Sequence, residues 1–308
     1  MAVGGEHERH GEPFDTIRSS SPLERERVAL EIGKLPKLVL IDTDGLLRHE
    51  EPDPDISDEL SKQIGESGIL KNPLIATSDH GAASHILLDG VNRHEALRRL
   101  EARFTLIQEV DIDSDGIVLS TWNHAVEDLD MKTAVDDLTA RLTMRPFSGR
   151  FTESGDFIPP GDEEIAGCIV LPDGSCYGIH APGGPRQRLE AVTAIADRIG
   201  WTSKRDRVSY TNMNDLKKHY PGFSALVCFG QFSKTDIMQL SIEGVRFPCS
   251  ITRFCVPKRV LSFNLPLSLL QGEGTLEEKR ILLQLHVLDK IRNRKIKFYE
   301  EPTFYFDD

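Results

Sequence analysis

Between residues 87 and 96, an apolar stretch ends in a glycine and is followed at once by a cationic, helix-forming stretch. Asp89 and Gly90 close the apolar part, and Arg93 falls in the first turn of the predicted helix. The free N–H groups at a helix start and a nearby guanidinium both attract an anion. An arginine here opposes the helix dipole, so an anionic partner would explain its presence. The residues alone leave a second interpretation open, in which Gly90 only turns the chain and Arg93 is solvated.

This order of strand, Asp-Gly, two residues, Arg and helix resembles a motif of the ParB/sulfiredoxin-like superfamily. In its free-serine kinase branch, the motif reads approximately Asp-Gly-His-His-Arg before a helix rich in alanine and leucine. Asp89, Gly90 and Arg93 match this motif. Val91 and Asn92 stand where the two histidines would be. The resemblance implies that all five residues bind a nucleotide and that Asp89 and Arg93 take part in catalysis. Asn92 can still donate hydrogen bonds to the nucleotide, but the Val91 side chain cannot.

A second match lies upstream, where His49, Glu50 and Glu51 follow the first predicted strand. A His-Glu pair occupies this place in the kinase branch. Phosphoryl transfer to an alcohol is helped by a carboxylate that accepts the hydroxyl proton, because a neutral hydroxyl is a poor nucleophile. We expect Glu50 to be this base, with Glu51 as the alternative, and His49 and Glu51 to contact the substrate. The competing interpretation, a solvated acidic loop, suits Glu51 better than Glu50.

Two further elements resemble the amino-acid pocket of these kinases. Trp122 follows Ser-Thr in a predicted strand, and Thr252 and Arg253 lie in an extended segment between apolar residues. The resemblance implies that Trp122 lines the pocket. It also implies that Thr252 and Arg253 hold the serine carboxylate or a phosphate, which suits the planar guanidinium fork. Each has an ordinary alternative, since a tryptophan in a strand is often core packing and Arg253 could pair with an internal acid.

The resemblance to the free-serine kinases, carried by the order of these elements, implies a kinase that converts free L-serine to O-phospho-L-serine. ATP is the favoured donor, with ADP as the alternative, and Mg²⁺ is the expected metal ion without an assigned protein ligand. The sequence has no Walker motif and no glycine-rich loop of a protein kinase. Sulfiredoxin activity is not expected, because Val91 stands at the place of its reactive cysteine. The alternative function is a ParB-like nucleotide- or DNA-binding regulator without phosphotransfer, although no helix-turn-helix pattern follows Arg93.

Composition narrows the choice of partners and compartment. The chain has 49 acidic and 37 basic residues and a formal charge of −12, so we do not expect it to bind nucleic acid. No apolar stretch reaches the ~20 residues that span a bilayer, and residues 1–22 lack the apolar segment of a secretory signal. The five cysteines form no Cys-x-x-Cys pair and indicate reduced thiols. We therefore expect a cytoplasmic protein without membrane segments.

Apolar periodicity predicts strands and helices that are mixed along the whole chain. Residues 146–162 contain three prolines and three glycines and are expected to form a loop or a boundary. The predicted strands and extended segments cover 37–42, 72–79, 84–90, 104–112, 117–126, a hairpin over 165–181, 224–230, 247–257 and 296–306. The predicted helices are a short one after Ser21 and those over 56–68, 92–102, 130–142, 185–201, 235–244 and 276–294.

These elements predict an α+β protein in two parts with the active site between them. Residues 1–22 are expected to form a disordered tail. Residues 23–150 are expected to form a ParB/sulfiredoxin-like nucleotide-binding domain, and residues 151–308 a mixed α/β domain that completes the substrate site. The predicted base and nucleotide residues fall in the first part, while Thr252 and Arg253 fall in the second.

Overall fold

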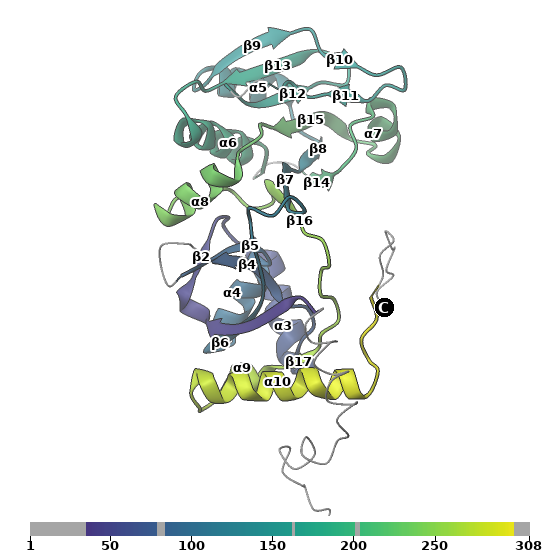
Figure 1. The fold of residues 1–308 in the computed structure, drawn as a ribbon. Helices are drawn as coiled ribbons and strands as arrows, with labels where there is room; N and C mark the ends of the chain where they lie inside the picture. Colours follow the sequence, from purple (N-terminus) through teal and green to yellow (C-terminus); the bar gives the residue numbers. More distant parts are fainter. Residues whose placement is uncertain (1–34, 79–83, 162–163, 201–203, 299–308) are drawn as a thin grey trace, which may run out of the picture.

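The computed structural model describes residues 35–78, 84–161, 164–200 and 204–298. The predicted tail and the short helix after Ser21 lie outside these residues. Figure 1 shows two lobes, each built on a β-sheet and joined by extended segments. Helices and strands alternate in both lobes, so the fold is mixed α/β.

The first lobe is built on a five-stranded sheet with the strand order β1-β6-β4-β5-β2. Strands β2 and β5 run parallel, and β4 and β5 are antiparallel. The helices α3 and α4 contact each other, and the 3₁₀ turn η1 joins β1 to β2. The bounds are β1 (Lys37–Asp42), η1 (Thr43–Gly45), β2 (Leu46–Arg48), α3 (Pro54–Ser67), β4 (Leu74–Ser78), β5 (His85–Asp89), α4 (Val91–Arg99) and β6 (Phe104–Val110).

The second lobe is built on a six-stranded sheet with the order β14-β8-β15-β12-β13-β9, in which all neighbours are antiparallel. Strands β14 and β9 are therefore its two edges. The strands are β8 (Asn123–Glu127), β9 (Thr143–Phe147), β12 (Ile165–Val170), β13 (Cys176–His180), β14 (Lys204–Val208) and β15 (Phe223–Phe229), with the hairpin β10 (Arg150–Phe151) and β11 (Phe157–Ile158). The helices are α5 (Met131–Thr139), α6 (Pro185–Gly200), α7 (Met213–His219) and α8 (Lys234–Ile242).

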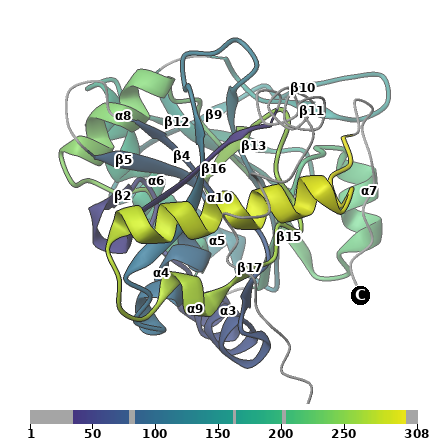
Figure 2. The same ribbon diagram turned by 60° about the horizontal axis from the view of Figure 1, so that its bottom comes forward.

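The chain crosses between the lobes and then returns. Strands β7 (Val118–Thr121) and β16 (Thr252–Cys255) pair where the lobes meet. After β16 an extended segment leads back to the first lobe, where β17 (Leu265–Pro266) pairs with β3 (Ile69–Leu70). The helices α9 (Leu267–Leu270) and α10 (Leu276–Arg292) then lie across the base of that lobe (Figures 1 and 2).

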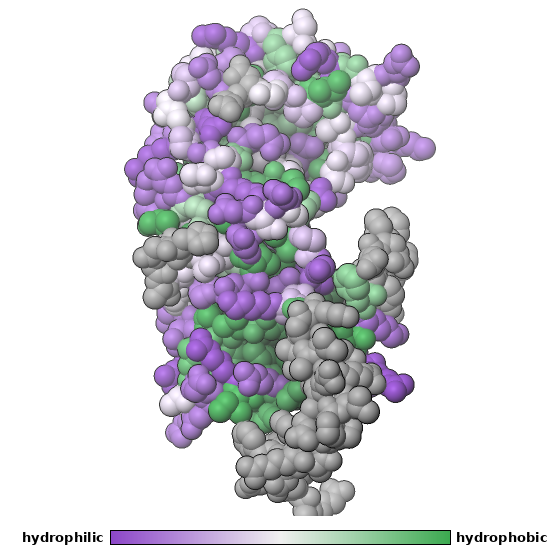
Figure 3. All heavy atoms as spheres, viewed as in Figure 1, coloured by the Kyte–Doolittle hydropathy of each residue, from purple (hydrophilic) through white to green (hydrophobic). Residues whose placement is uncertain are grey.

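Both ends of the described chain thus build the first lobe. Leu267, Leu270 and Leu283 belong to the same buried cluster as Leu40 of β1 and Leu106 of β6. On the face shown in Figure 3, hydrophobic residues gather over this lobe, while the second lobe is mostly hydrophilic.

The predicted boundary near residue 150 falls just after β9, which already belongs to the second sheet. By sheet membership and packing, the first lobe comprises residues 37–110 and 265–292, and the second comprises residues 123–242. We propose these limits for the two structural units. A fragment that ended near residue 150 would lack α10 and would carry unpaired strands of the second sheet.

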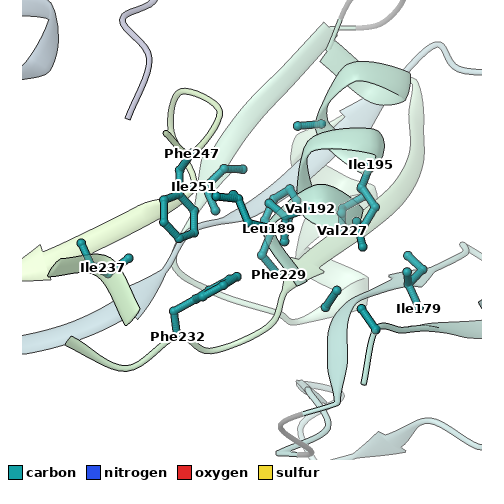
Figure 4. Close-up of a cluster of buried hydrophobic side chains, with 14 of the residues drawn as sticks. Ile179, Leu189, Val192, Ile195, Val227, Phe229, Phe232, Ile237, Phe247 and Ile251 are labelled. Carbon is teal, nitrogen blue, oxygen red and sulfur yellow. The ribbon is translucent and has the colours of Figure 1, made fainter. Parts of the chain in front are cut away.

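A shared hydrophobic core fixes the two lobes to each other. Ile75 of β4 and Leu88 of β5 belong to the same buried cluster as Phe247 and Ile251, which precede β16. In Figure 4, Phe247 and Ile251 lie beside side chains of the second lobe, and the rings of Phe232 and Phe247 meet edge to face at 4.8 Å between centroids. The segment that precedes β16 is therefore anchored in apolar packing on one side.

Most predicted elements are confirmed, with three corrections. The strand predicted over 117–126 is two strands, β7 and β8, which separate at Trp122 and pair in different sheets. Residues 146–162 contain the end of β9 and the β10–β11 hairpin as well as loops. Of the strand predicted over 296–306, residues 296–298 form no strand, and the remainder lies outside the described residues.

Candidate active site between the two lobes

Glu50 follows β2 and is buried where the first lobe meets the segment before β16. Only 7% of its surface is exposed. Its Oε1 accepts hydrogen bonds from the N–H groups of Ile251 at 3.1 Å and Thr252 at 2.6 Å, and from the Thr252 hydroxyl at 2.6 Å. The backbone of Glu50 also forms a parallel bridge with Phe247. Neutral donors thus hold Oε1, and among the described residues no hydrogen bond engages Oε2.

His49 is the second buried member of this group. Its Nδ1 lies 2.5 Å from the carbonyl oxygen of Leu87, and its Nε2 lies 2.7 Å from the Thr252 hydroxyl. Because a carbonyl oxygen only accepts, Nδ1 donates in the first contact. His49 therefore links the end of β5 to Thr252 and orients the hydroxyl that contacts Glu50. Its predicted contact with a substrate stays a prediction.

Glu51, the neighbouring carboxylate, has a different environment. Its side chain is 53% exposed and forms an ion pair with Arg246 at 3.2 Å. An exposed ion pair of this kind fixes a side chain only weakly. The structure thus favours Glu50 over Glu51 as a carboxylate held in one place.

The Asp89 turn is built around a glycine that no other residue could replace without strain. Gly90 has a φ of +99°, and a Cβ there would lie 2.8 Å from Nη2 of Arg93 and 3.1 Å from Cγ of Leu74. The Arg93 guanidinium folds back over Gly90 and donates to Oδ2 of Asp89 at 3.1 Å. Arg259, from the segment that returns to the first lobe, donates to the same oxygen.

Positive charge exceeds negative charge at this turn. Burial lowers the pKa of the Arg93 guanidinium, while the Asp89 carboxylate opposes this shift and the guanidinium of Arg259 adds to it. The buried Nε of Arg93 has no hydrogen-bond partner among the described residues. Two guanidiniums share one carboxylate beside the start of α4, so an anion bound here would neutralise excess charge.

The register of the first sheet brings Glu50 and Asp89 to the same edge. Strands β2 and β5 are parallel, and Arg48 is the register partner of Leu87. Glu50 follows Arg48 by two residues, as Asp89 follows Leu87. Because parallel strands end on the same side of a sheet, both carboxylates lie at the edge that meets the second lobe.

Asn92 and Val91 complete the predicted nucleotide segment. The Oδ1 of Asn92 accepts from the Asp53 N–H at 2.8 Å and from the Ser57 hydroxyl at 3.3 Å, which ties the start of α3 to the start of α4. No hydrogen bond engages its side-chain nitrogen among the described residues, so that group is free to donate to a ligand. Val91 packs against the core of the first lobe.

Trp122 lies between β7 and β8 and meets two arginines. Its backbone N–H donates to the Ile251 carbonyl at 2.9 Å. The guanidinium carbon of Arg253 lies 4.4 Å from the ring centroid, and that of Arg207 lies at 5.4 Å. Within the described chain no carboxylate pairs with Arg253, so the internal acid considered from the sequence is not found there.

The structure thus gathers the predicted residues into two neighbouring groups and adds residues that the sequence did not indicate. His49, Glu50 and Thr252 form one group, and Asp89, Gly90 and Arg93 form the other. Residues that sequence reasoning did not assign to the site are Arg205, Arg207 and Arg259. Alternation of arginines over residues 204–208 was the available signal for the first two, and for the third it was the pattern Pro257-Lys258-Arg259, which resembles a Pro-x-Arg element of the free-serine kinases.

A bound metal ion would depend on the nucleotide for most of its ligands. The described residues contain no group of three or more His, Cys, Asp or Glu side chains suited to a metal. Mg²⁺ in kinases is typically bound through one or two carboxylates and the substrate phosphates. Asp89 fits this minimal requirement, since its contacts with Arg93 and Arg259 use only Oδ2.

A surface hollow of about 580 Å³ lies apart from this site, at the far end of α4. It is lined by residues such as Asp44, Arg98 and Arg103 and contains none of the predicted site residues. In the part of the chain that the structure describes, no helix is long and apolar enough to cross a membrane.

Comparisons with known proteins point to one group of enzymes. No family model matches the chain. It is 32% identical over 104 residues to an ATP-dependent L-serine kinase of Staphylothermus marinus, an alignment that covers 31% of this chain and 41% of that protein. It is 23% identical over 274 residues to the ATP-dependent L-serine kinase SbnI of Staphylococcus aureus, covering 87% of this chain and 96% of SbnI. The chain therefore matches less than half the length of the first of these relatives.

Solved structures give a likeness of fold over most of the chain. A carboxy-terminally truncated SbnI superposes with a TM-score of 0.65 at 19% identity, covering 82% of this chain and 97% of that one. A free serine kinase in complex with AMP superposes with a TM-score of 0.61 at 19% identity, covering 77% and 95%. The chain therefore has the fold of these proteins, in which both lobes are present.

Proposed function

We propose that this protein is a kinase that transfers a phosphoryl group from ATP to the hydroxyl of free L-serine and forms O-phospho-L-serine. The observation that carries the proposal is Glu50, a buried carboxylate of the first lobe whose position is fixed by the segment at the start of β16. It lies at the same sheet edge as a turn suited to phosphate. The names of the relatives and the likeness to a nucleotide-bound kinase structure support the same reaction.

In the proposed reaction, Glu50 accepts the serine hydroxyl proton on Oε2. The serine oxygen then forms a bond to the γ-phosphorus while the bond from that phosphorus to the bridging oxygen breaks, and ADP leaves. A base held in place before the substrate arrives contributes about 10²–10⁴-fold to such a step. Ile251 and Thr252 keep Oε1 occupied, and Oε2 has no hydrogen bond among the described residues, so it is the oxygen available to the serine hydroxyl.

The nucleotide is proposed to bind at the Asp89 turn. Its phosphates would contact Arg93 and the N–H groups at the start of α4, with Asn92 donating from its side-chain nitrogen and Gly90 allowing close approach. When bound, Mg²⁺ would neutralise charge on the phosphates, and Asp89 is the residue that would hold it. ATP is favoured over ADP because the relatives are named ATP-dependent.

Serine is proposed to bind on the side of the second lobe. Arg253 would bind the carboxylate through its guanidinium fork, and Trp122 would line the pocket. Thr252 supports this site indirectly, because its hydroxyl contacts both His49 and Glu50. Glu51 remains the alternative base. We further propose that the first lobe belongs to the ParB/sulfiredoxin-like class and that the protein acts in the cytoplasm.

The test is phosphoserine formation by the full-length protein. We expect L-serine, Mg²⁺ and ATP to give O-phospho-L-serine and ADP in equal amounts, measured by mass spectrometry and by ³¹P NMR. Parallel reactions with ADP identify the donor, since ADP would yield AMP. Hydrolysis of ATP without phosphoserine, or no turnover with either donor, would contradict the proposal.

A further inference from the structure

Three arginines that have no carboxylate partner among the described residues lie near one another in the second half of the chain's fold. The protein has a formal charge of −12, and ten of its described arginines form an ion pair with a carboxylate. The paired arginines are Arg48, Arg93, Arg98, Arg99, Arg186, Arg188, Arg198, Arg246, Arg259 and Arg280. Of the described arginines without a carboxylate partner, Arg103, Arg141, Arg145, Arg150 and Arg294 lie elsewhere in the fold, and Arg205, Arg207 and Arg253 remain.

These three arginines come together where the lobes meet. Arg207 and Arg253 lie over the ring of Trp122, within 5.4 Å and 4.4 Å of its centroid. Arg205 donates to the sulfur of Cys249 at 3.3 Å. Figure 1 shows β14, which carries Arg205 and Arg207, beside β7 and β16 at this junction.

Strand alternation separates these arginines from the paired residues of β14. Lys204 contacts Asp128, and Asp206 accepts from the Tyr220 hydroxyl. Arg205 and Arg207 point to the opposite face, because side chains two residues apart on a strand share a face. Only the face of β14 that carries Arg205 and Arg207 therefore has positive charge without a carboxylate partner among the described residues. A strand that is simply solvated at the edge of its sheet would not be expected to differ in this way between its two faces.

Arg205 is also linked to the proposed base through Cys249. Cys249, the partner of Arg205, precedes by two and three residues the N–H groups that hold Glu50. Burial raises the pKa of the Cys249 thiol, Arg205 opposes this shift, and the carboxylates of Asp53 and Glu50 add to it. Charges of both lobes therefore meet around Cys249.

The number of cations exceeds what serine needs. L-serine is a zwitterion with one carboxylate, for which Arg253 alone would suffice. O-phospho-L-serine adds a phosphate monoester of about −1.5 to −2 charge at neutral pH. A site with three unpaired guanidiniums is therefore better matched in charge to the product than to the substrate.

Resting on the proposed function, we propose that Arg205 and Arg207, together with Arg253, form a subsite that binds the phosphorylated amino acid more tightly than serine. Arg205 and Arg207, which share one face of β14, face the phosphoryl group, and Arg253 faces the carboxylate. The product accordingly competes with serine and inhibits the forward reaction. The subsite thus makes turnover depend on removal of O-phospho-L-serine by a reaction that consumes phosphate monoesters of amino acids.

Isothermal titration of the full-length protein with O-phospho-L-serine, L-serine and inorganic phosphate tests this subsite. We expect phosphoserine to bind at least about tenfold more tightly than serine at low salt, with the difference shrinking as salt rises. Arg205→Gln and Arg207→Gln should each weaken phosphoserine binding by about tenfold and change serine binding less than about threefold. Arg205→Lys and Arg207→Lys, which keep the charge, should retain part of the preference.

Arg145→Gln is the matched control, because Arg145 is exposed on β9, the opposite edge strand of the same sheet. It should leave all three affinities unchanged. Equal affinities of wild type for serine and phosphoserine, or equal losses for both ligands in the Arg205 and Arg207 variants, would overturn the subsite. Equally tight binding of inorganic phosphate would overturn its assignment to the phosphorylated amino acid. Arginine-dependent phosphoserine binding in a protein that forms no phosphoserine from serine would instead reject the kinase and keep the subsite.

Discussion

Glu50 and Asp89 are carboxylates at the same edge of the first sheet, and they are held in opposite ways. Glu50 is buried, is bound by two backbone N–H groups and a hydroxyl, and has no cationic partner among the described residues. Asp89 is 39% exposed at its side chain and is paired with Arg93 and Arg259. Neutral donors fix a carboxylate and leave it able to accept a proton, whereas two guanidiniums around one carboxylate leave positive charge for an anion.

The two regions also differ in how they are built. The Asp89 turn depends mainly on residues close in sequence, from Leu74 to Arg93, with Arg259 added from the returning segment. The Glu50 group joins residues that are 201 and 202 positions apart. A change in the first region should therefore alter nucleotide binding, and a change in the second should alter the chemical step or the joining of the lobes.

The largest effect on the Asp89 side is expected from Arg93→Ala. Loss of a charge-assisted phosphate contact of about 1.5–3 kcal/mol should lower kcat/KM for ATP by about tenfold to a hundredfold. Steady-state kinetics and nucleotide titration measure this loss. Arg99→Ala on the same helix, where Arg99 pairs with Asp58 and Glu95, serves as the control and should behave as wild type. Unchanged affinity and turnover in Arg93→Ala would remove the nucleotide from this turn.

Gly90→Ala tests the shape of the same turn. The positive φ and the close approach of Arg93 and Leu74 should lower the free energy of unfolding by about 1–3 kcal/mol. Gly68→Ala is a useful comparison, because Gly68 has a φ of +64° but open space around its Cβ position. Denaturant unfolding should show the larger loss for Gly90→Ala, together with weaker nucleotide binding. Equal losses in both variants would mean that the packing of Arg93 over the glycine contributes little.

Arg253→Lys tests the serine side. A lysine keeps the charge but loses the planar fork, so we expect serine KM to rise by about tenfold and nucleotide KM to stay near its wild-type value. Arg145→Lys should change neither constant. A rise in nucleotide KM alone would assign Arg253 to nucleotide binding with the Asp89 turn.

The smallest effect concerns His124, which supports the segment that holds Glu50. Its Nε2 lies 2.9 Å from the carbonyl oxygen of Ser250, and its ring meets Phe229 edge to face. Burial lowers the pKa of His124 to about 4, and the positive charges of Arg205 and Arg207 add to this shift. The hydrogen bond with Ser250 and the carboxylate of Asp206 oppose it. The unfolded chain, with a pKa near 6.5, therefore binds a proton first as the pH falls.

Stability from this histidine is thus present above about pH 6.5 and is lost as the pH falls toward 4. Between about pH 6 and pH 5 the free energy of unfolding should drop by about 1 kcal/mol on this account. Urea unfolding at each pH measures the slope for wild type and for His124→Gln. An identical slope in both proteins would show that His124 does not titrate in this way.

The sequence predicted the parts of the site that depend on local structure. The strand, the glycine turn and the helix start that carry Asp89, Gly90 and Arg93 are set by neighbours along the chain, and the structure confirms these elements. Burial of Glu50 could not be read from its neighbours, because its donors Ile251 and Thr252 come from a distant segment. The composition of the first lobe could not be predicted from neighbours along the chain either, because α10 packs into its core from the far end of the chain.

Arg205 and Arg207 show a second limit. Their alternation on one strand face is visible in the sequence, but the face that meets Trp122 follows only from the position of β14 at the edge of the sheet beside β8. Edge strands of alternating charge are common on solvated surfaces, so the pattern alone does not indicate a ligand.

The central claim is that Glu50 acts on serine and not on the nucleotide. A single-turnover experiment with enzyme in excess over γ-labelled ATP, quenched at short times in the presence of L-serine, tests it most directly. Glu50→Gln should bind ATP as wild type does and form phosphoserine at least about a hundredfold more slowly. Glu51→Gln, the matched neighbour, should keep its rate within about threefold, since its side chain is exposed and paired with Arg246. Phosphoserine formed by Glu50→Gln at the wild-type rate would contradict the account.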